Sequence, residues 1–379
     1  MQMNAIDQQN ADPAEVARQA GETFAGGGLV VFPTETVYGI GASALNSEGF
    51  EALRRFKDRP SQPFTIHMGQ PEEAGRYVDL EVPLVRRAVA KLLPGPVSLV
   101  IELDEATIAS KLEALGLPPD EPHRLYHKQA VGLRCPDHPL GQRVLGAIDD
   151  PVVASSANLR GAPPPQDVDQ ASRAAAESGA MIVDGGPCRF AKSSTIVRIG
   201  SGPCGDGRIT IEREGVYDER TVRRLMRWTL LLVCSGNTCR SPMAQAMAQE
   251  FLARQRGIGV EDLEAAGLQV RSAGTFAAEG SPASPFAIQT MADMGLDLTR
   301  HRAARLTPQL LQSADLVYCM TSAHRAEAER VCPAAAHKIT TVDPDRDVED
   351  PIGDGPKAYQ RCAELIRRRL DSRLKGLQI

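Results

Sequence analysis

The sequence has no apolar run of the roughly 20 residues that a membrane-spanning helix requires, so no transmembrane segment is expected. Its eight cysteines include no Cys-x2-Cys pair of the kind that commonly binds zinc, so no metal site is predicted. The polar first ten residues lack the basic start and apolar core of a signal peptide. The net charge of -5 gives no electrostatic reason to expect non-specific nucleic-acid binding. These absences favour a cytoplasmic protein.

The composition is that of an ordinary globular protein, with 42% hydrophobic and 24% charged residues. At 379 residues the chain is long enough for two or three domains. No long Gly/Ser linker divides it, so neighbouring domains are expected to touch. The patterns described below place the boundary near Arg227, between a domain of residues 1–227 and a domain of residues 228–379.

The most informative stretch, residues 231–242, is predicted to form a buried strand, a short loop and the start of a helix. Residues 229–233 are apolar and β-favouring, whereas Pro242 suits the first turn of a helix. Five residues separate Cys234 from Arg240. A loop this short can direct backbone N–H groups toward an oxyanion, and the helix adds its positive N-terminal end. The stretch therefore predicts a phosphate-binding site.

The same surroundings are expected to lower the pKa of the Cys234 thiol, which makes it a candidate nucleophile in a reducing compartment. Arg240 could hold two oxygens of a transferring phosphoryl group in its planar fork, and Ser241 could donate a hydrogen bond to the leaving thiolate. The Cys-x5-Arg spacing alone is weak evidence, because it also occurs by chance. The strand before it and the Ser-Pro and helix after it argue against chance.

From about Trp228 to its C-terminus the sequence resembles the low-molecular-weight protein tyrosine phosphatases, which share the Cys-x5-Arg-Ser loop and a downstream Asp-Pro. The resemblance implies a phosphoprotein substrate, a phosphocysteine intermediate and no cofactor. The alternation of strands and helices in this half predicts a Rossmann-like parallel sheet with helices on both faces. The implied site comprises the catalytic residues Cys234, Arg240 and Asp350 and the loop residues Ser235, Gly236, Asn237, Thr238, Cys239 and Ser241.

The general acid is identified as Asp350 because, among Asp350 and the four acids that compete with it, only Asp350 precedes a proline. Asp345, Asp347, Glu349 and Asp354 are the competing candidates.

The substrate stays open between phosphotyrosine and phosphoarginine. Thr238 resembles the loop threonine of the bacterial protein-arginine phosphatases, in which the hydroxyl disfavours a tyrosine ring. Aromatic residues that sandwich such a ring are missing near Asp350, since Ile352 follows it and the nearest downstream aromatic is Tyr359. Against phosphoarginine, those relatives commonly have Phe where Ile352 stands.

Cys239 matches a second loop cysteine in some of these phosphatases and is predicted to form a reversible disulfide with Cys234 under mild oxidation. The alternative is a small buried residue that fills the loop. For the whole half, the alternative function is that of an arsenate-reductase-like thiol enzyme, which needs two further, closely spaced shuttle cysteines. Cys319 and Cys332 are separated by twelve residues and do not match that pattern.

The N-terminal half is predicted to contain buried strands at residues 29–32, 64–68, 97–103, 131–134 and 151–154. Polar residues follow several of them, at the usual ligand edge of an open α/β sheet. The run 33–41 could instead be a hairpin turn with exposed threonines. Ser47 is expected to cap a helix that delivers Lys57, and residues 104–128 are interpreted as an insertion or mobile loop.

Across about residues 13–226 these segments resemble, in order, the Sua5/YrdC/YciO family of threonylcarbamoyl-AMP synthases. The segments are 33–41, 57–60, 94–97, 131–139, 156–158, 184–186 and 194–195. The resemblance implies a twisted open α/β sheet that binds ATP with Mg2+, L-threonine and bicarbonate. It assigns ATP binding to Lys57, Arg59, Ser156, Asn158 and Ser194, and threonine binding to Thr36, His67 and Arg134. Arg134 would meet a carboxylate.

Together the two halves predict a bifunctional α/β enzyme. Its first product would be used in tRNA t6A biosynthesis, with a tRNA-modifying transferase as the expected partner. The alternative for the N-terminal half is a nucleotide- or RNA-binding module, able to hold tRNA or double-stranded RNA, that kept the fold without the reaction. The presence of both the Lys-x-Arg and the Ser-x-Asn pairs favours the enzyme.

Overall fold

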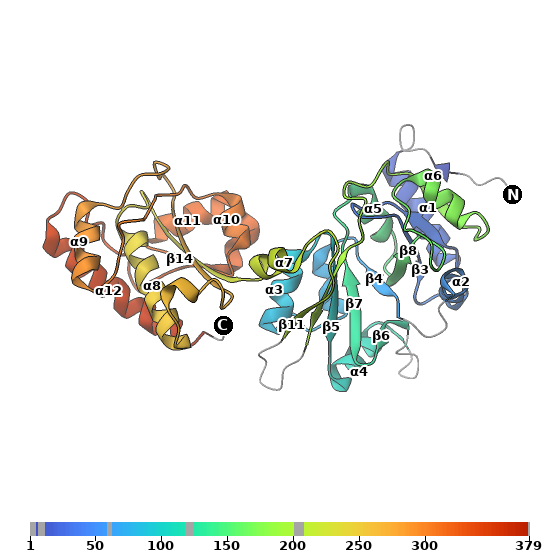
Figure 1. Cartoon of the computed structure of the whole chain (residues 1–379), viewed down its shortest axis with the longest axis horizontal. Coiled ribbons are helices and arrows are strands. Elements are labelled where there is room, and N and C mark those ends of the chain that lie inside the picture. Colours follow the sequence, from blue (N-terminus) through green and yellow to red (C-terminus); the bar gives the residue numbers. More distant parts are fainter. Residues whose placement is uncertain (1–4, 7–11, 59–62, 118–123, 201–207, 378–379) are drawn as a thin grey trace. The chain divides into compact units, whose positions relative to one another are not determined.

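The computed structural model describes residues 5–6, 12–58, 63–117, 124–200 and 208–377 (Figure 1). By its internal contacts the chain divides into two units, Met1–Met226 and Arg227–Ile379. The predicted boundary assigned Arg227 to the first domain. Both units are α/β, which confirms the predicted fold class. None of the described helices is long and apolar enough to cross a membrane.

In the described part of the first unit, eleven strands form one mixed sheet. Their order across the sheet is β1 (Ala5–Ile6), β9 (Met181–Val183), β2 (Val30–Phe32), β3 (Gly39–Ser43), β8 (Val152–Ser156), β4 (Thr65–His67), β7 (Ala130–Arg134), β5 (Val97–Glu102), β10 (Thr195–Ile199) and β11 (Ile209–Arg213). Strand β6 (Tyr126–His127) pairs with β7. The sheet contains both parallel pairs such as β4–β7 and antiparallel pairs such as β3–β8.

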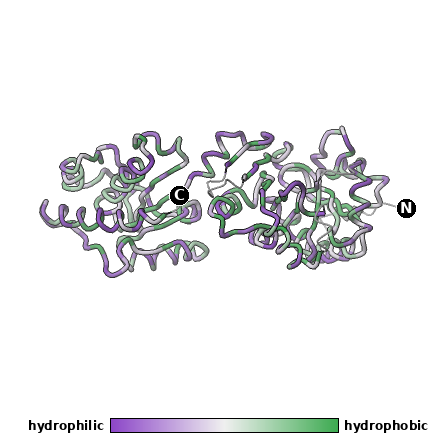
Figure 2. Tube along the Cα trace, turned by 90° about the horizontal axis from the view of Figure 1, so that it is seen from below, coloured by the Kyte–Doolittle hydropathy of each residue, from purple (hydrophilic) through white to green (hydrophobic). Residues whose placement is uncertain are grey.

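Helices cover both faces of this sheet, because its strands are apolar on both sides. Val30 and Phe32 of β2 pack toward α1 (Pro13–Ala25) and α5 (Pro139–Leu145), whereas Val31 belongs to the core that includes α2 (Ser47–Lys57) and α3 (Pro83–Leu92). The unit also contains η1 (Pro71–Arg76), α4 (Glu105–Ala114), α6 (Val168–Ala175) and α7 (Glu219–Leu225). Hydrophobic and hydrophilic stretches alternate along the chain trace (Figure 2).

Two local predictions in this unit are wrong. Asn46, one residue earlier than predicted, caps α2, since its side chain accepts hydrogen bonds from the N–H groups of Glu48 and Gly49. Residues 104–128 include a regular helix, α4, because Asp104 caps it and Ile108 and Leu112 bury its apolar face. Residues 118–123 of that segment lie outside the described residues.

The second unit has a four-stranded parallel sheet, as predicted, in the order β13 (Leu268–Gly274), β12 (Trp228–Cys234), β14 (Leu316–Cys319) and β15 (Ile339–Thr341). Leu230 and Leu232 pack against α8 (Arg240–Arg256), α9 (Pro285–Asp293) and α12 (Pro356–Leu374). Leu231 and Val233 face α10 (Pro308–Ser313) and α11 (Ser322–Val331) on the other side (Figure 1). Short 3-10 helices are η3 (Val260–Asp262) and η4 (Pro333–Lys338).

Because all four strands run the same way, their carboxyl ends meet at one edge. The loops that follow Cys234 in β12 and Cys319 in β14 therefore lie together at that edge, and the candidate site of this unit is there.

Candidate active sites

The loop between β12 and α8 is held by Asn237, which has a left-handed backbone with φ of 54°. Its side-chain Nδ2 donates to Ser241 Oγ and to Ser272 Oγ, each at 2.9 Å. Its Oδ1 accepts the N–H of Ala304 at 2.8 Å, and its carbonyl accepts from His301 Nε2 at 2.7 Å. With every polar group of Asn237 engaged, the unusual backbone conformation is locked and the loop is pre-formed.

The backbone of the loop at Ser235 also lies very close to the backbone of Gly274. A Cβ on Gly274, at the end of β13, would lie 2.3 Å from the Ser235 carbonyl oxygen, so only glycine fits there. Helix α8 follows with Cys239 at its N-cap position, and no side chain in the described part of the chain caps it. Its first N–H groups are therefore available to an anion at the end where the helix dipole is positive.

Arg240 enters the site from the first turn of α8 and is 4% exposed. Its Nη1 donates to the Val348 carbonyl at 3.1 Å, and its Nη2 contacts Ser235 Oγ at 3.4 Å and forms an ion pair with Asp350. Within the described residues its Nε has no hydrogen-bond partner. A buried guanidinium with an unused N–H is suited to a further oxyanion.

Cys234, the candidate nucleophile, ends β12 and is buried, with its Sγ 3.0 Å from Ser241 Oγ. Burial raises the pKa of this thiol, while hydrogen bonds from Ser241 and Asn237 and the charge of Arg240 act to lower it. The net direction is upward. The prediction of a lowered pKa is therefore wrong for the arrangement seen here, because the sequence showed the donors but not the extent of burial.

Among the competing acids, Asp350 is the one that reaches Arg240. Asp347 accepts hydrogen bonds from the N–H and hydroxyl of Ser322, and Asp345 lies 3.4 Å from Arg369. The Asp350 side chain is 39% exposed, so it lies at the mouth of the loop rather than beneath it. This placement suits a group that exchanges protons with a leaving group or water.

Several neighbours of the loop were missed in the sequence. Phe276 is 77% exposed, and its N–H donates to the Ser235 carbonyl at 3.0 Å, which places an aromatic residue beside the loop. Phe286, also exposed, packs edge-on against Tyr359. His324 contacts Ser235 from the first turn of α11, the helix that follows β14. Their common signal is position: Phe276 and His324 follow the carboxyl ends of strands at the edge where Cys234 lies.

Cys239 is a buried free thiol, with its Sγ 3.3 Å from Tyr359 Oη and 3.4 Å from Ser284 Oγ. Its predicted disulfide with Cys234 stays a prediction. The remaining loop residues, Gly236 and Thr238, are partly exposed, and the Thr238 carbonyl accepts the N–H of Ser284 at 2.9 Å.

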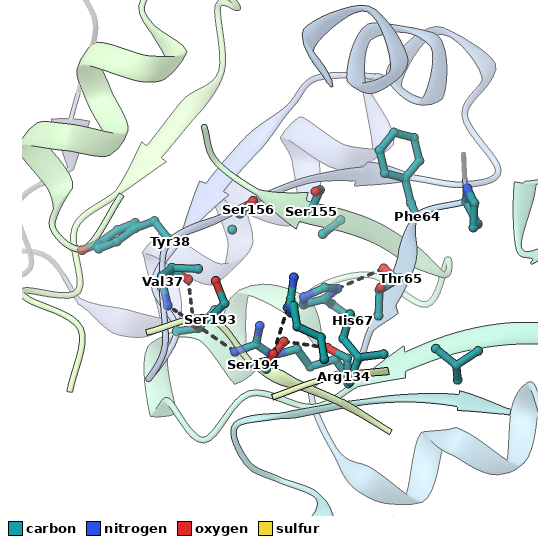
Figure 3. A pocket seen from close by; sticks show the side chains of 18 residues that line it. Val37, Tyr38, Phe64, Thr65, His67, Arg134, Ser155, Ser156, Ser193 and Ser194 are labelled. Atoms are coloured by element: carbon teal, nitrogen blue, oxygen red, sulfur yellow. Dashed lines mark hydrogen bonds between the residues drawn. The ribbon is translucent and has the colours of Figure 1, made fainter. Parts of the chain in front are cut away.

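The candidate site of the first unit is a cavity of about 190 Å³ (Figure 3). It is lined mainly by the β2–β3 loop and by the ends of β4, β7, β8 and β10. The lining includes Thr34, Phe64, His67, Ser98, Arg134, Ser155, Ser156, Ser193, Ser194 and Arg213.

The segment 33–38 does connect an antiparallel pair, β2 and β3, but its threonines are buried and not exposed. Thr34 Oγ1 accepts the N–H groups of Thr36 at 3.1 Å and Val37 at 3.2 Å, so the hydroxyl shapes the loop. Thr34 and Thr36 both turn their hydroxyls toward Arg134. Thr34 lines the cavity, whereas Thr36 is fully buried, is not a lining residue and contacts Arg134 behind the cavity wall.

Arg134 ends β7 and is 6% exposed. Its Nη2 donates to Thr34 Oγ1 at 3.3 Å, to Thr36 Oγ1, and to the buried carboxylate of Glu35 at 3.4 Å. Its Nε has no partner in the described structure. As with Arg240, a fixed guanidinium keeps an N–H available for an oxyanion.

His67 lies at the end of β4, beside Arg134 in the cavity (Figure 3). Burial, with the Arg134 charge as the second cause, lowers the pKa of His67 to about 3, so the imidazole is neutral near pH 7. Its Nδ1 lies 3.0 Å from the Thr65 carbonyl, which can only accept. The proton is therefore on Nδ1, and Nε2 is left as an acceptor.

The predicted ATP residues are only partly brought together. Ser156 and Ser194 line the cavity, on opposite walls from β8 and the start of β10. Lys57 is buried and its Nζ donates to the carbonyls of Ser156 at 2.8 Å and Asn158 at 2.5 Å. Lys57 thus fixes the Ser156–Asn158 segment from behind, and Arg59 lies outside the described residues.

Arg213 is a cavity residue that sequence reasoning missed. It comes from β11, at the edge of the sheet, and its Nη2 donates to the Ser194 carbonyl at 2.8 Å. Burial and the nearby Arg134 lower its pKa, which shows that two guanidinium groups share this space. None of the described residues that line the cavity is a carboxylate. The arrangement favours an anion with several oxygens.

Comparison with known proteins gives one family for each unit. The family described as telomere recombination (Sua5/YciO/YrdC) matches residues 22–215, and the low molecular weight phosphotyrosine protein phosphatase family matches residues 229–378. The threonylcarbamoyl-AMP synthase of Bacillus subtilis is 27% identical over 289 residues, which cover 68% of this chain and 77% of that protein.

Two relatives match the second unit. The probable low molecular weight protein-tyrosine-phosphatase EpsP of Ralstonia nicotianae is 36% identical over 146 residues, 38% of this chain and 92% of that protein. The protein-arginine-phosphatase of Geobacillus stearothermophilus is 33% identical over 158 residues, 40% of this chain and 98% of that protein.

Proposed function

Because the chain belongs to the Sua5/YciO/YrdC family over residues 22–215 and to the low-molecular-weight phosphotyrosine protein phosphatase family over residues 229–378, we propose that it is a bifunctional enzyme. The first unit would form threonylcarbamoyl-AMP from ATP, bicarbonate and L-threonine. The second would hydrolyse a phosphoprotein through a phosphocysteine. The observation that supports both is the same: each unit has a buried arginine, Arg134 or Arg240, that keeps an unpaired Nε at its site.

In the first unit, Arg134 would bind the threonine carboxylate, since its Nε and planar fork suit a carboxylate. Neutral His67 would accept a hydrogen bond through Nε2 from the threonine hydroxyl or amine. Carboxylation of the amine by bicarbonate releases water, and a carbamate oxygen then attacks the α-phosphorus of ATP. The bond to pyrophosphate breaks, and Arg213 with the serine hydroxyls would stabilise the developing charge.

Mg2+ is expected to arrive with ATP. The described residues of the cavity lining offer hydroxyl and guanidinium groups and no carboxylate, so they provide no typical protein ligand for this ion. Mg2+ would be held by the phosphate oxygens and would supply charge neutralisation there. The residues of this chain would fix the Ser156–Asn158 segment through Lys57 and place the threonine through Arg134.

The test is transfer of labelled bicarbonate into an acid-labile product that requires both ATP and L-threonine. Lys57→Ala should lose most of this activity, because the carbonyls of Ser156 and Asn158 lose their shared donor. If the protein binds ATP but incorporates no bicarbonate, the alternative of a nucleotide- or RNA-binding module is supported instead. A tRNA-modifying transferase that consumes the product is the partner we propose.

In the second unit, Cys234 as thiolate would attack phosphorus while the leaving group departs with a proton from Asp350. Asp350 would then take a proton from water as the water attacks the phosphocysteine, which releases phosphate and restores the thiolate. In the structure Asp350 is paired with Arg240, so a bound phosphoryl group would compete for the guanidinium and free the carboxyl to reach the leaving atom. The Ser241 hydroxyl, 3.0 Å from Sγ, would stabilise the thiolate.

Burial of the two candidate shuttle thiols, Cys319 and Cys332, favours a phosphatase over an arsenate-reductase-like enzyme. Cys319 is inside β14, and burial raises its pKa to about 12, so it is a poor nucleophile. The test is rapid acid quenching with a 32P-labelled phosphopeptide. Label should be trapped on Cys234 and should accumulate in Asp350→Asn; label that never appears on protein would contradict the phosphocysteine mechanism.

The substrate of the second unit is proposed to be phosphoarginine, on the basis of Thr238 and of the ion pair that Asp350 already makes with a guanidinium. Exposed Phe276 beside the loop favours the second candidate, phosphotyrosine, because it offers one aromatic wall for a ring.

A further inference from the structure

His324 connects α11 to the first residue of the phosphate loop. It is 7% exposed, and its Nε2 lies 2.8 Å from Ser235 Oγ. Its Nδ1 lies 2.8 Å from the hydroxyl of Thr321, the N-cap residue of α11, which also accepts the His324 N–H at 3.2 Å. Ser235 Oγ in turn contacts Arg240 Nη2 at 3.4 Å. A continuous chain of polar contacts therefore runs from Thr321 through His324 and Ser235 to Arg240.

The imidazole in this chain is neutral. Burial, with the Arg240 charge as the second cause, lowers the pKa of His324 to about 4, although Asp350 and Asp347 act in the opposite direction. A neutral ring carries one proton, so two arrangements exist. Either Nε2–H donates to Ser235 and Thr321 donates to Nδ1, or Nδ1–H donates to Thr321 and Ser235 donates to Nε2.

An anion in the loop selects between them. In the first arrangement Ser235 Oγ accepts from His324 Nε2 and Arg240 Nη2, which uses both lone pairs and leaves its O–H as a donor. In the second, the Ser235 proton is spent on the histidine and a lone pair is left to repel the anion. Only the first arrangement gives an oxyanion another hydrogen-bond donor.

We propose that His324 is a positioning residue for the phosphoryl group, which acts by fixing Ser235 as a hydrogen-bond donor to the anion held by the Cys234 loop. His324 does not touch the reacting atoms, and its effect passes through the Ser235 hydroxyl. This inference rests on the proposed phosphatase function of the same site. It extends that function to a residue 90 positions from the nucleophile, brought there because β12 and β14 are adjacent and parallel.

A purely structural role would give different results. Thr321 and His324 also begin α11, so loss of the ring could simply loosen the helix. If the ring only stabilises the helix, variants of His324 should share a lower melting temperature. If the ring fixes a hydrogen-bond donor, its loss should weaken anion binding, and a side chain with an N–H at the same place should restore that binding. The amide nitrogen of glutamine approximates the position of Nε2, so His324→Gln is the matched conservative variant.

The experiment uses the full chain and two probes, inorganic phosphate as a ligand and p-nitrophenyl phosphate as a substrate. His324→Ala should weaken phosphate binding, measured by calorimetry, about tenfold, the usual effect of losing one hydrogen bond to a charged group. It should lower kcat/KM to a similar extent, and His324→Gln should recover most of both. In the background of Ser235→Ala, the further change His324→Ala should leave phosphate affinity and kcat/KM unchanged, because the hydroxyl through which His324 acts is already absent. The exposed His337 provides the control, and His337→Ala should behave as wild type.

Additive losses in the double variant, or unchanged phosphate affinity in His324→Ala, would overturn the proposal. If His324→Ala does not fold, Ser235→Ala and His324→Gln decide the matter by the same comparison. Wild-type protein that binds phosphate but does not hydrolyse p-nitrophenyl phosphate would contradict the phosphatase function, while the binding series would still decide the role of His324. Wild-type protein that does neither would overturn both.

Discussion

The two candidate sites hold a buried arginine in different ways. In the second unit, Arg240 belongs to one contiguous stretch, and the candidate oxyanion donors beside it are backbone N–H groups of the loop and of the uncapped first turn of α8. In the first unit, Arg134 meets hydroxyl groups and a carboxylate from a separate hairpin, and the rest of the cavity comes from other strands. Anion binding by backbone N–H groups depends on the conformation of a single loop. Anion binding by side chains depends on several strand ends that meet at the pocket. The comparison predicts that single substitutions act most strongly in the loop.

The largest effect is expected for Cys234→Ser. It removes the nucleophile without emptying the loop, and phosphatase activity should fall by a factor on the order of 10⁴ or more. Steady-state hydrolysis of a phosphopeptide measures this, with Cys332→Ser as the matched control for a buried thiol outside the site. Equal losses in both variants would mean that the thiol contributes through packing only.

In the first unit, Arg134→Lys should raise the KM for L-threonine about a hundredfold, because one ammonium cannot serve both Glu35 and a substrate carboxylate. The KM for ATP should change little. Arg143→Lys, at an exposed position of α5, is the control. An unchanged threonine KM in Arg134→Lys would remove the carboxylate role and leave Arg134 as a partner of Glu35 alone.

The first unit should also be sensitive to acid through His67, which lies in its pocket. Unfolded histidine binds a proton below a pKa of about 6.5, whereas folded His67 stays neutral down to about 3. The unfolded state therefore binds more protons in this window, and the free energy of unfolding decreases as the pH falls from 6.5 toward 3. Between pH 7.5 and 5.0 the loss from this group should be about 2 kcal/mol.

His67→Asn keeps a donor for the Thr65 carbonyl but does not titrate. Urea unfolding of wild type and variant, followed by circular dichroism at both pH values, should show the extra loss in the wild type only. Identical losses in the two proteins would contradict the buried neutral imidazole.

A smaller effect, on substrate preference, is expected at Thr238, because we do not expect its side chain to determine the conformation of the loop. Thr238→Ile should shift the ratio of kcat/KM for phosphoarginine and phosphotyrosine peptides toward phosphotyrosine by about tenfold, since an aliphatic side chain packs better against an aromatic ring. Thr238→Ser, which keeps the hydroxyl, should leave the ratio near the wild-type value. A wild-type preference for phosphotyrosine would return the second unit to an ordinary tyrosine phosphatase.

A site within one contiguous stretch can be predicted from the sequence more fully than a site assembled from distant strands. The strand, loop and helix around Cys234 lie in one stretch of sequence. Their order alone therefore predicted a phosphate-binding loop followed by Arg240. The parallel sheet followed from strand and helix alternation. Asn237 is held by Ser272 and His301, which come from distant segments of the chain. No local sequence pattern links these two residues to Asn237.

Quantities set by burial could not be predicted either. The donors near Cys234 suggested a lowered pKa, and only the structure shows that burial outweighs them. In the first unit the resemblance named Lys57 and Ser156, but the sequence did not show that Lys57 binds the carbonyls behind the cavity. Arg213 was missed because it comes from the edge strand β11, remote in sequence from the other residues.

We expect both anion sites of the chain to work although they are built differently, and pyrophosphate release by the purified protein tests the first of them. With Mg2+, ATP and bicarbonate present, release should depend on L-threonine, should be lost in Arg134→Lys at low threonine, and should continue at the wild-type rate in Cys234→Ser. Pyrophosphate release that is absent or independent of threonine would contradict the account of the first site. A dependence on Cys234 would contradict the separation of the two.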